Sequence, residues 1–226
     1  LNVGGPIGLG ATSNIFLGQV EAPLLIKPYL SSMTRHELLI IMTVGMSTIA
    51  GSVMVVYTTM LFPIYGAGLI GHFLSASLIS VPAAIMYSNI MLPSDVKTDF
   101  PDKSSNELYG SVMDAITQGT KNGLDIFLNV IAMLIVVMAL VFLVNSILSL
   151  FPPLFGDPIT LELLLGYLFA PLAWFMGIPW EESIIAGQLL GVKTALNEFV
   201  AYLYLADTDT YQLTDKSRLI MLYALC

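Results

Sequence analysis

Three stretches of this sequence are apolar for long enough to cross a lipid bilayer as a helix, which takes about 20 residues. They run over residues 37–62, residues 67–92 and the part of residues 111–150 that begins at Leu124. The chain is 56% hydrophobic and only 11% charged, whereas soluble domains are about 45–50% apolar and about 25% charged. A soluble fold cannot bury this surplus, so we predict an all-α polytopic membrane protein.

Two further apolar regions, residues 1–30 and residues 159–204, are each interrupted by proline, glycine and carboxylate residues. The interruptions cover residues 18–23 and residues 177–182. Each half is too short to span, and irregular backbone at membrane depth is tolerated only where it is buried in protein or lines a cavity. Two such segments in corresponding positions predict re-entrant helical hairpins that form a transporter's binding site.

The order of the segments predicts inverted repeats, in which a hairpin followed by helices occurs twice. We assign a first re-entrant hairpin to residues 1–34, and two transmembrane helices with a cytoplasmic loop to residues 35–110. Residues 111–158 supply an interfacial segment and one long transmembrane helix. Because this single helix makes the number of membrane crossings between the two copies odd, the second copy is inverted. A second re-entrant hairpin occupies residues 159–210, and residues 211–226 begin a further, truncated transmembrane helix.

Basic residues indicate which helix ends face the cytoplasm, because cytoplasmic loops carry an excess of Lys and Arg. Those near the first two spans fall on one side of the predicted topology: Lys27, Arg35, Lys97, Lys103 and Lys121. We place that side in the cytoplasm of a multi-pass plasma-membrane protein, which in a bacterium means the inner membrane. Because the chain has no basic cluster, nucleic acid is not an expected partner.

Glu21 and Glu182 are carboxylates in segments expected at membrane depth, where an ionisable group costs about 2.5–3.5 kcal/mol on insertion scales. Such a group is a functional-site candidate by default. If both hairpins reach the midplane, both carboxylates face one cavity and accept hydrogen bonds from a polar ligand, and Gln19 offers a donor and an acceptor. The alternative is that they lie at the water interface and only end helices. For the adjoining Glu181, a solvated or structural role is favoured.

Lys193, Asn197 and Glu198 form a second polar group, in which Lys193 and Asn197 share one helix face at their spacing of four. A structural Lys–Glu pair is favoured there over a gate. Thr48 can bond across a helix interface, as hydroxyls do where small residues let helices approach, or it can bind a cation. The sequence shows no nucleophile–base pair and no metal-ligand spacing, so we do not expect an enzyme or a cofactor.

Several motifs resemble those of the concentrative nucleoside transporters, in family order along nearly the whole chain. Residues 14–24 resemble the family's first hairpin, and residues 47–53 the helix that follows it. Residues 177–182 and 197–202 are similar to the second hairpin. Residues 223–226 resemble the short run that, in the family, directly precedes a further substrate-binding segment.

This resemblance implies a nucleoside:cation symporter that forms a homotrimer and moves a hairpin-bearing transport domain by an elevator-type mechanism. The residues it implies are Gln19, Val20, Glu21, Val53 and Glu182 for the substrate, and Asn14, Leu17, Thr48 and Ile49 for sodium. Gln19 and Glu21 would hydrogen-bond the nucleobase, and Glu182 would bind the ribose hydroxyls. Asn14 and Thr48 side chains would hold the ion with the Leu17 and Ile49 carbonyls.

Two positions depart from the family pattern. Val20 stands where many members have a hydroxyl residue, which leaves the base preference open, whereas Thr48 replaces a common serine and keeps the hydroxyl. Since the sequence begins at Leu1 and stops at Cys226 within an apolar run, we expect truncation at both ends.

The leading hypothesis is secondary active transport of nucleosides coupled to sodium symport, with sodium as the coupling ion. The alternatives are a proton-coupled nucleoside symporter and a non-transporting truncated remnant. From another class, the rival is an intramembrane enzyme that uses Glu21 and Glu182 as acid and base.

Overall fold

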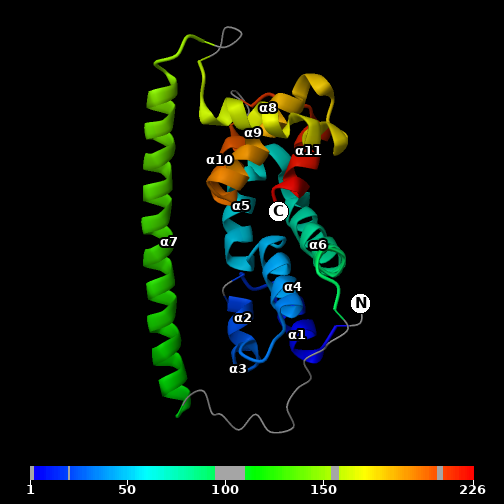
Figure 1. The fold of residues 1–226 in the computed structure, drawn as a ribbon, viewed down its shortest axis with the longest axis vertical. Helices are drawn as coiled ribbons and strands as arrows, with labels where there is room; N and C mark the ends of the chain where they lie inside the picture. Colours follow the sequence, from blue (N-terminus) through cyan, green and yellow to red (C-terminus); the bar gives the residue numbers. More distant parts are fainter. Residues whose placement is uncertain (1–2, 20, 95–109, 154–157, 208–210) are drawn as a thin grey trace. The chain divides into compact units, whose positions relative to one another are not determined.

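The computed structural model describes residues 3–19, 21–94, 110–153, 158–207 and 211–226. All regular elements in these ranges are helices, as the apolar runs predict (Figure 1). The chain divides into two compact units, Leu1–Leu108 with Cys226 and Tyr109–Leu225, and each is described by itself.

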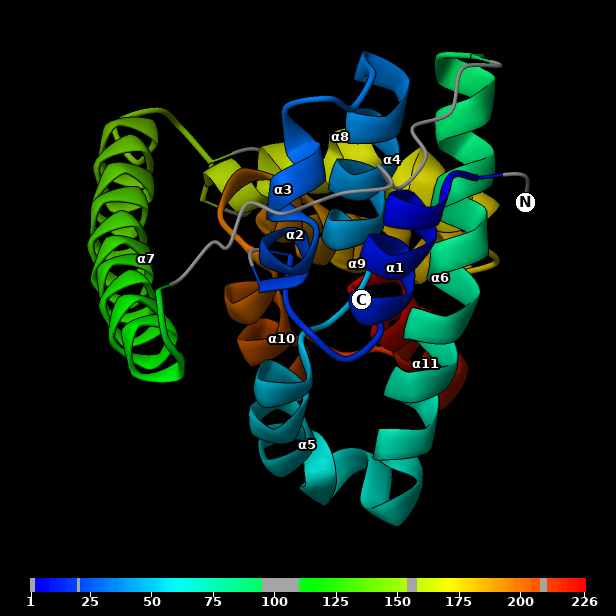
Figure 2. The same ribbon diagram turned by 90° about the horizontal axis from the view of Figure 1, so that it is seen from below.

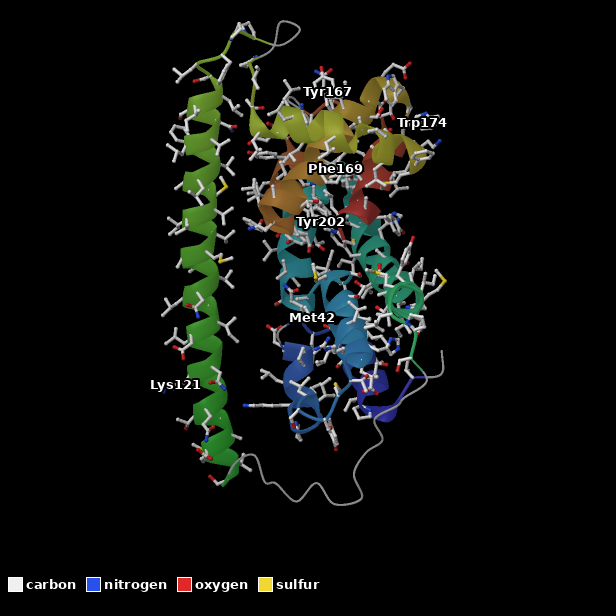
Figure 3. All side chains as sticks on the ribbon, viewed as in Figure 1. Met42, Lys121, Tyr167, Phe169, Trp174 and Tyr202 are labelled. Carbon is white, nitrogen blue, oxygen red and sulfur yellow. The ribbon has the colours of Figure 1, made fainter. Side chains whose placement is uncertain are left out.

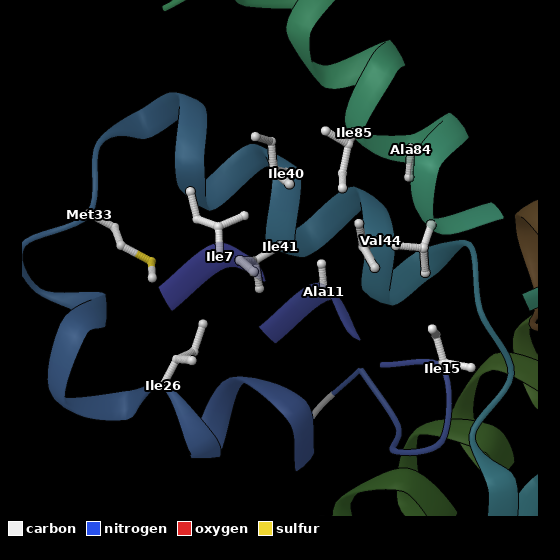
Figure 4. Packing of buried hydrophobic residues seen from close by; sticks show 11 residues of the cluster. Ile7, Ala11, Ile15, Ile26, Met33, Ile40, Ile41, Val44, Ala84 and Ile85 are labelled. Carbon is white, nitrogen blue, oxygen red and sulfur yellow. The ribbon is translucent and has the colours of Figure 1, made fainter. Parts of the chain in front are cut away.

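The first unit packs around one central helix. Its helices are α1 (Gly5–Ser13), α2 (Glu21–Leu25), α3 (Lys27–Leu30), α4 (Arg35–Met46), α5 (Gly51–Tyr65), the short 3-10 helix η1 (Gly66–Gly68) and α6 (Leu69–Met91). α4 packs against α1 and α6, and α5 packs against α6 (Figure 2). Apolar side chains from α1, α4, α6, the α2–α3 segment and the links beside them converge into one core (Figure 4). It is made of Ile7, Ala11, Ile15, Ile26, Met33, Ile40, Ile41, Val44, Val81, Ala84 and Ile85.

A capping box starts α4. The Glu37 N–H donates to Thr34 Oγ1 at 3.3 Å, and the Thr34 N–H donates to Glu37 Oε2 at 2.9 Å. Two N–H groups at the helix start are satisfied in this way. The box explains how the Glu37 side chain can be only 1% exposed in an apolar helix.

The predicted first span, residues 37–62, is not one continuous helix. α4 ends at Met46 and α5 begins at Gly51, so residues 47–50 interrupt it. The Gly51 N–H donates to the Phe16 carbonyl at 2.9 Å, and a Cβ at Gly51 would lie 2.8 Å from the same oxygen. The helix is therefore broken where its backbone meets the interruption that follows α1.

After α5 the chain turns back at Gly66, whose φ of 68° is a conformation that glycine adopts without strain. α6 then returns alongside α5 and α4. By length and composition, the stretch Arg35–Met91 is apolar enough to cross a membrane. It contains both of the first two spans predicted from the sequence.

The second unit contains α7 (Val112–Leu148), α8 (Leu161–Phe175), α9 (Trp180–Ala195), α10 (Glu198–Ala206) and α11 (Asp215–Ala224). α9 packs against α8, α10 and α11, and α7 contacts α8. Asn145 makes the link between α7 and α8. Its Oδ1 accepts from the Leu161 N–H at 2.7 Å, and its Nδ2 donates to Glu162 Oε2 at 3.0 Å.

α7 is one uninterrupted helix of 37 residues, about 56 Å long at about 1.5 Å per residue. It is apolar enough to cross a membrane and exceeds a hydrocarbon core of about 30 Å. None of its residues is buried, and its side chains extend outward along its whole length (Figure 3). A surface this apolar suits lipid contact.

α8 and α9 form a closely packed pair, bent by 117° at a short break. Gly177 in the break has a φ of 98°. Gly187 and Gly191, four residues apart on α9, face α8, and a Cβ at Gly187 would lie 2.4 Å from the Gly166 carbonyl oxygen. Small residues at this spacing let two helix backbones approach closely.

Candidate functional site

In the first unit, the most unusual polar group is the side chain of Asn14, the residue that caps the C-terminus of α1. This side chain is 0% exposed, and among the described residues neither Oδ1 nor Nδ2 has a hydrogen-bond partner. A buried polar group without a partner costs about 1–3 kcal/mol. Such a group in a native fold needs an explanation, and one explanation is an ion.

Thr48 lies in the interruption between α4 and α5, and its side chain is 7% exposed. Its Oγ1 donates to the Val44 carbonyl at 3.1 Å, which leaves the oxygen lone pairs for another donor or a cation. The Phe16–Gly51 hydrogen bond joins the segment that follows Asn14 to the segment that contains Thr48. The predicted sodium ligands thus lie on two interruptions that meet within one unit, with Ile49 buried and Leu17 37% exposed.

These residues fit the chemistry of a small hard cation. Backbone carbonyls at broken helices coordinate sodium in transporters, and hydroxyl and side-chain amide oxygens offer further lone pairs. A carboxamide oxygen that is buried and unpaired is available for that purpose without giving up another bond.

Of the residues predicted to bind substrate in this unit, Val20 lies outside the described residues. Gln19 is exposed and lines a cavity of about 150 Å³ with Pro23, Ile41, Met42, Gly45 and Met46. Glu21 is not in the interruption, because it is the first residue of α2. Val53 is half-buried in the first turn of α5.

In the second unit, Glu181 and Glu182 also follow the interruption rather than lie in it, because both belong to the first turn of α9. The positive end of the helix dipole stabilises carboxylates at that place. Glu182 is half-buried, whereas Glu181 is exposed, in keeping with the solvated role favoured from sequence. Glu182 Oε2 accepts hydrogen bonds from the N–H and the Oγ1–H of Thr214, both at 3.2 Å.

The predicted shared face of Lys193 and Asn197 is wrong, because the helix ends between them. Lys193 is in the last turn of α9, and Asn197 caps α10 by accepting the Val200 N–H at 2.9 Å. Lys193 Nζ donates to the Ala224 carbonyl at 3.2 Å. These contacts support a structural role for both residues. Helical spacing could not reveal Ala224 as a partner of Lys193, because Ala224 belongs to another helix, α11.

Sequence reasoning missed Thr214 and Gly45. A threonine before Asp215, Lys216 and Ser217 is a recognisable helix cap, but its contact with Glu182, 32 residues away, is a tertiary one. Gly45 lies against two predicted site residues. A Cβ there would lie 3.0 Å from Gln19 Cβ and 3.9 Å from Asn14 Nδ2. Among the described residues, no group of three or more His, Cys, Asp or Glu side chains could hold a metal ion.

Known proteins resemble this chain over most of its length. A family model described as "Na+ dependent nucleoside transporter C-terminus" matches residues 72–226. An uncharacterised transporter of Bacillus subtilis, YutK, is 40% identical over 224 residues, covering 96% of this chain and 54% of that protein. The nucleoside permease NupC of Helicobacter pylori is 36% identical over 223 residues, covering 96% of this chain and 52% of that protein.

The fold is similar to a solved one as well. A structure of CNTnw in an inward-facing substrate-bound state matches with a TM-score of 0.82 at 35% identity, covering 100% of this chain and 53% of that one. The chain therefore spans about half the length of these relatives.

Proposed function

The chain belongs to the concentrative nucleoside transporter family, and from this premise we propose that it is part of a sodium-coupled symporter that carries nucleosides across the plasma membrane. The nucleoside substrate is supported by the names of the matching family and of the permease NupC. The observation that supports coupling to sodium is the buried side-chain amide of Asn14, which has no hydrogen-bond partner among the described residues and lies beside the break between α4 and α5.

In this proposal, Asn14 Oδ1, Thr48 Oγ1 and the carbonyls of Leu17 and Ile49 hold the sodium ion. The ion supplies a positive charge that pairs the orphaned amide oxygen and fixes both interruptions. Gln19 is five residues beyond Asn14 on the same interrupted segment, so ordering one end of the segment preorganises the other. A ligand that binds second then meets a smaller entropic cost, which is coupling without a large structural change.

We assign substrate roles to residues of each unit by itself. In the first, we assign Gln19 and Glu21 to hydrogen bonds with the nucleobase and Val53 to apolar contact with it, while a role for Val20 stays a prediction. In the second, we assign Glu182 to the ribose hydroxyls. The α1–α2 and α8–α9 segments are proposed as re-entrant hairpins of an elevator-type transport domain in a multi-pass homotrimer. The 117° bend of α8–α9 and the unburied apolar surface of α7 are consistent with that arrangement.

Glu182→Gln should raise the KM for uridine about 10–100-fold, because a hydrogen bond to a charged acceptor contributes about 1.5–3 kcal/mol. The neighbouring Glu181→Gln is the matched control, since Glu181 is exposed, and its KM should stay within about twofold of wild type. The measurement is the initial rate of uptake against uridine concentration in the full-length transporter. An unchanged KM in Glu182→Gln would remove Glu182 from the site.

Gly45→Ala should weaken both sodium and nucleoside binding by about tenfold, because the added methyl group presses on Gln19 and approaches Asn14 and such overpacking costs about 1–3 kcal/mol. Gly71→Ala on α6 is the control, as a Cβ there meets nothing within 4 Å. Sodium and uridine titrations of the two purified variants make the comparison. Wild-type affinities in Gly45→Ala would show that α4 does not position these residues.

The proposed function is tested by calorimetric titration of uridine into the purified full-length transporter, in sodium chloride and in potassium chloride. We expect binding that is at least about tenfold tighter in sodium, a coupling free energy of about 1.4 kcal/mol. Equal affinity in both salts, with affinity that instead follows pH, would favour proton coupling. No binding of uridine or of a purine nucleoside in either salt would contradict the substrate class.

A further inference from the structure

We propose that Lys193 is a positioning residue whose ammonium group acts as a fixed cation at the end of α11, so that the second unit takes no exchangeable cation there. The inference rests on the sodium site proposed above for the first unit, and it limits the exchangeable cation to that site. Lys193 lies in the last turn of α9. Its Nζ donates to the Ala224 carbonyl, at the end of α11, at 3.2 Å.

The end of α11 is fully paired within its own unit. The last four carbonyls of a helix have no partner inside it. In α11, the N–H of Leu225 serves two of them, and the buried hydroxyl of Tyr202, labelled in Figure 3, donates to the Leu222 carbonyl at 2.9 Å. The carbonyl of Ala224 is paired by Lys193, the charged donor of this set.

A positive charge is favoured at this place because two helix C-termini meet there. α9 ends at Ala195 and α11 ends at Ala224, and the two helices pack against each other. Each C-terminus carries a partial negative charge, and such helix ends coordinate cations in transporters. Because Lys193 is half-buried, solvent ions screen its charge less than that of an exposed lysine.

The first unit has a comparable arrangement but no charged side chain at it. The segment after α1 meets the break after α4, where the Phe16 carbonyl accepts from the Gly51 N–H at 2.9 Å. Among the described residues of that unit, the lysine and arginine side chains are Lys27 and Arg35, which are exposed at the starts of α3 and α4. A cation at the Asn14 amide therefore has to come from solution, whereas in the second unit the chain supplies it.

A purely structural role for Lys193 would have a different signature. If the residue acted as a hydrogen-bond donor alone, a neutral donor such as glutamine would replace it, and cations in solution would not change the behaviour of a variant. The discriminating quantity is therefore the response of each variant to added cations. This response requires folded protein and does not depend on its yield.

The experiment measures uridine uptake against sodium concentration in proteoliposomes that contain the full-length transporter. Lys193→Arg keeps the charge, and its uptake should stay within about threefold of wild type. Lys193→Gln and Lys193→Ala should lower uptake at low sodium by about tenfold or more, the effect of losing a hydrogen bond to a charged group. Lys216→Ala, which removes an exposed charge from α11, is the matched control and should behave as wild type.

Lys193→Ala leaves room for a small cation, and this gives the sharpest expectation. Its Hill coefficient for sodium should exceed that of wild type by about one, because a second ion now has to bind. Methylammonium chloride should restore its uptake by mass action to within about threefold of wild type. Tetramethylammonium chloride has the same charge but no N–H donor and a larger cation, and it should not restore uptake.

Wild-type uptake in Lys193→Gln or Lys193→Ala would overturn the fixed cation, as would a loss in Lys193→Ala that neither sodium nor methylammonium reverses. If Lys193→Ala does not fold, the other two variants decide: loss in Lys193→Gln with retention in Lys193→Arg supports the proposal, and any other pattern overturns it. Wild-type uptake that ignores sodium would contradict the Asn14 site instead. The methylammonium response of Lys193→Ala would still test Lys193 in that case.

Discussion

Gly187→Ala should destabilise the protein by on the order of 3 kcal/mol, because overpacking a close contact costs about 1–3 kcal/mol and more where nothing can move aside. The added Cβ would lie 2.4 Å from the Gly166 oxygen and 2.9 Å from the Ala170 nitrogen. Both atoms belong to the backbone of α8, so no rotamer change relieves the clash. α8 and α9 must separate, and the α8–α9 contact that positions Glu182 is lost. The measurements are thermal unfolding of the full-length transporter in detergent and its uridine uptake.

The same substitution at Gly119 of α7 is the matched control. A Cβ at Gly119 meets nothing within 4 Å, and alanine in a helix is favoured over glycine by about 1 kcal/mol. The melting temperature of Gly119→Ala should therefore stay the same or rise. Equal melting temperatures for the two variants would contradict the close packing of α8 against α9.

Asn14→Leu should remove the stabilisation by sodium and the sodium-driven uptake, and leave the stability of the sodium-free protein about the same. Leucine branches at the same carbon as asparagine but is larger, so overpacking at this buried position costs about 1–3 kcal/mol. It also removes a buried amide whose lack of partners costs about 1–3 kcal/mol. The two effects offset each other, so stability in sodium-free buffer should change little. Sodium at about 100 times its dissociation constant should stabilise wild type by about 2.7 kcal/mol. The variant should lose this increment and its sodium-driven uptake.

Melting temperatures in sodium and in potassium chloride test this prediction. Asn129→Leu is the control, since Asn129 is exposed on α7, and it should keep the full sodium-induced shift. A shift of wild-type size in Asn14→Leu would rule out a sodium site that includes the Asn14 amide.

The sequence is sufficient for the features that depend on local composition. Apolar runs of spanning length predict α6 and α7, and the proline–glycine interruptions predict the breaks after α1 and α8. The break at residues 47–50 is different, because residues 38–62 contain no proline and no charged residue, and the Gly51 N–H at the break bonds to the Phe16 carbonyl. Pattern alone could not separate that interrupted helix from a continuous span.

Tertiary contacts explain the remaining gaps in the predicted site. Gly187 and Gly191 were not singled out from the sequence, because a glycine spacing of four does not name α8 as the partner. Thr214 and Glu182 are polar residues whose pairing depends on how α11 folds back onto α9. Asn14 was identified through resemblance, and its physical basis, a buried amide without a partner, became visible only in the structure.

The most direct test of sodium-coupled nucleoside transport is uptake of radiolabelled uridine into proteoliposomes that contain the full-length transporter. We predict accumulation above the external concentration under an inward sodium gradient and only equilibration without it. Accumulation that is the same with and without the sodium gradient, or no uptake of uridine under either condition, would contradict the account.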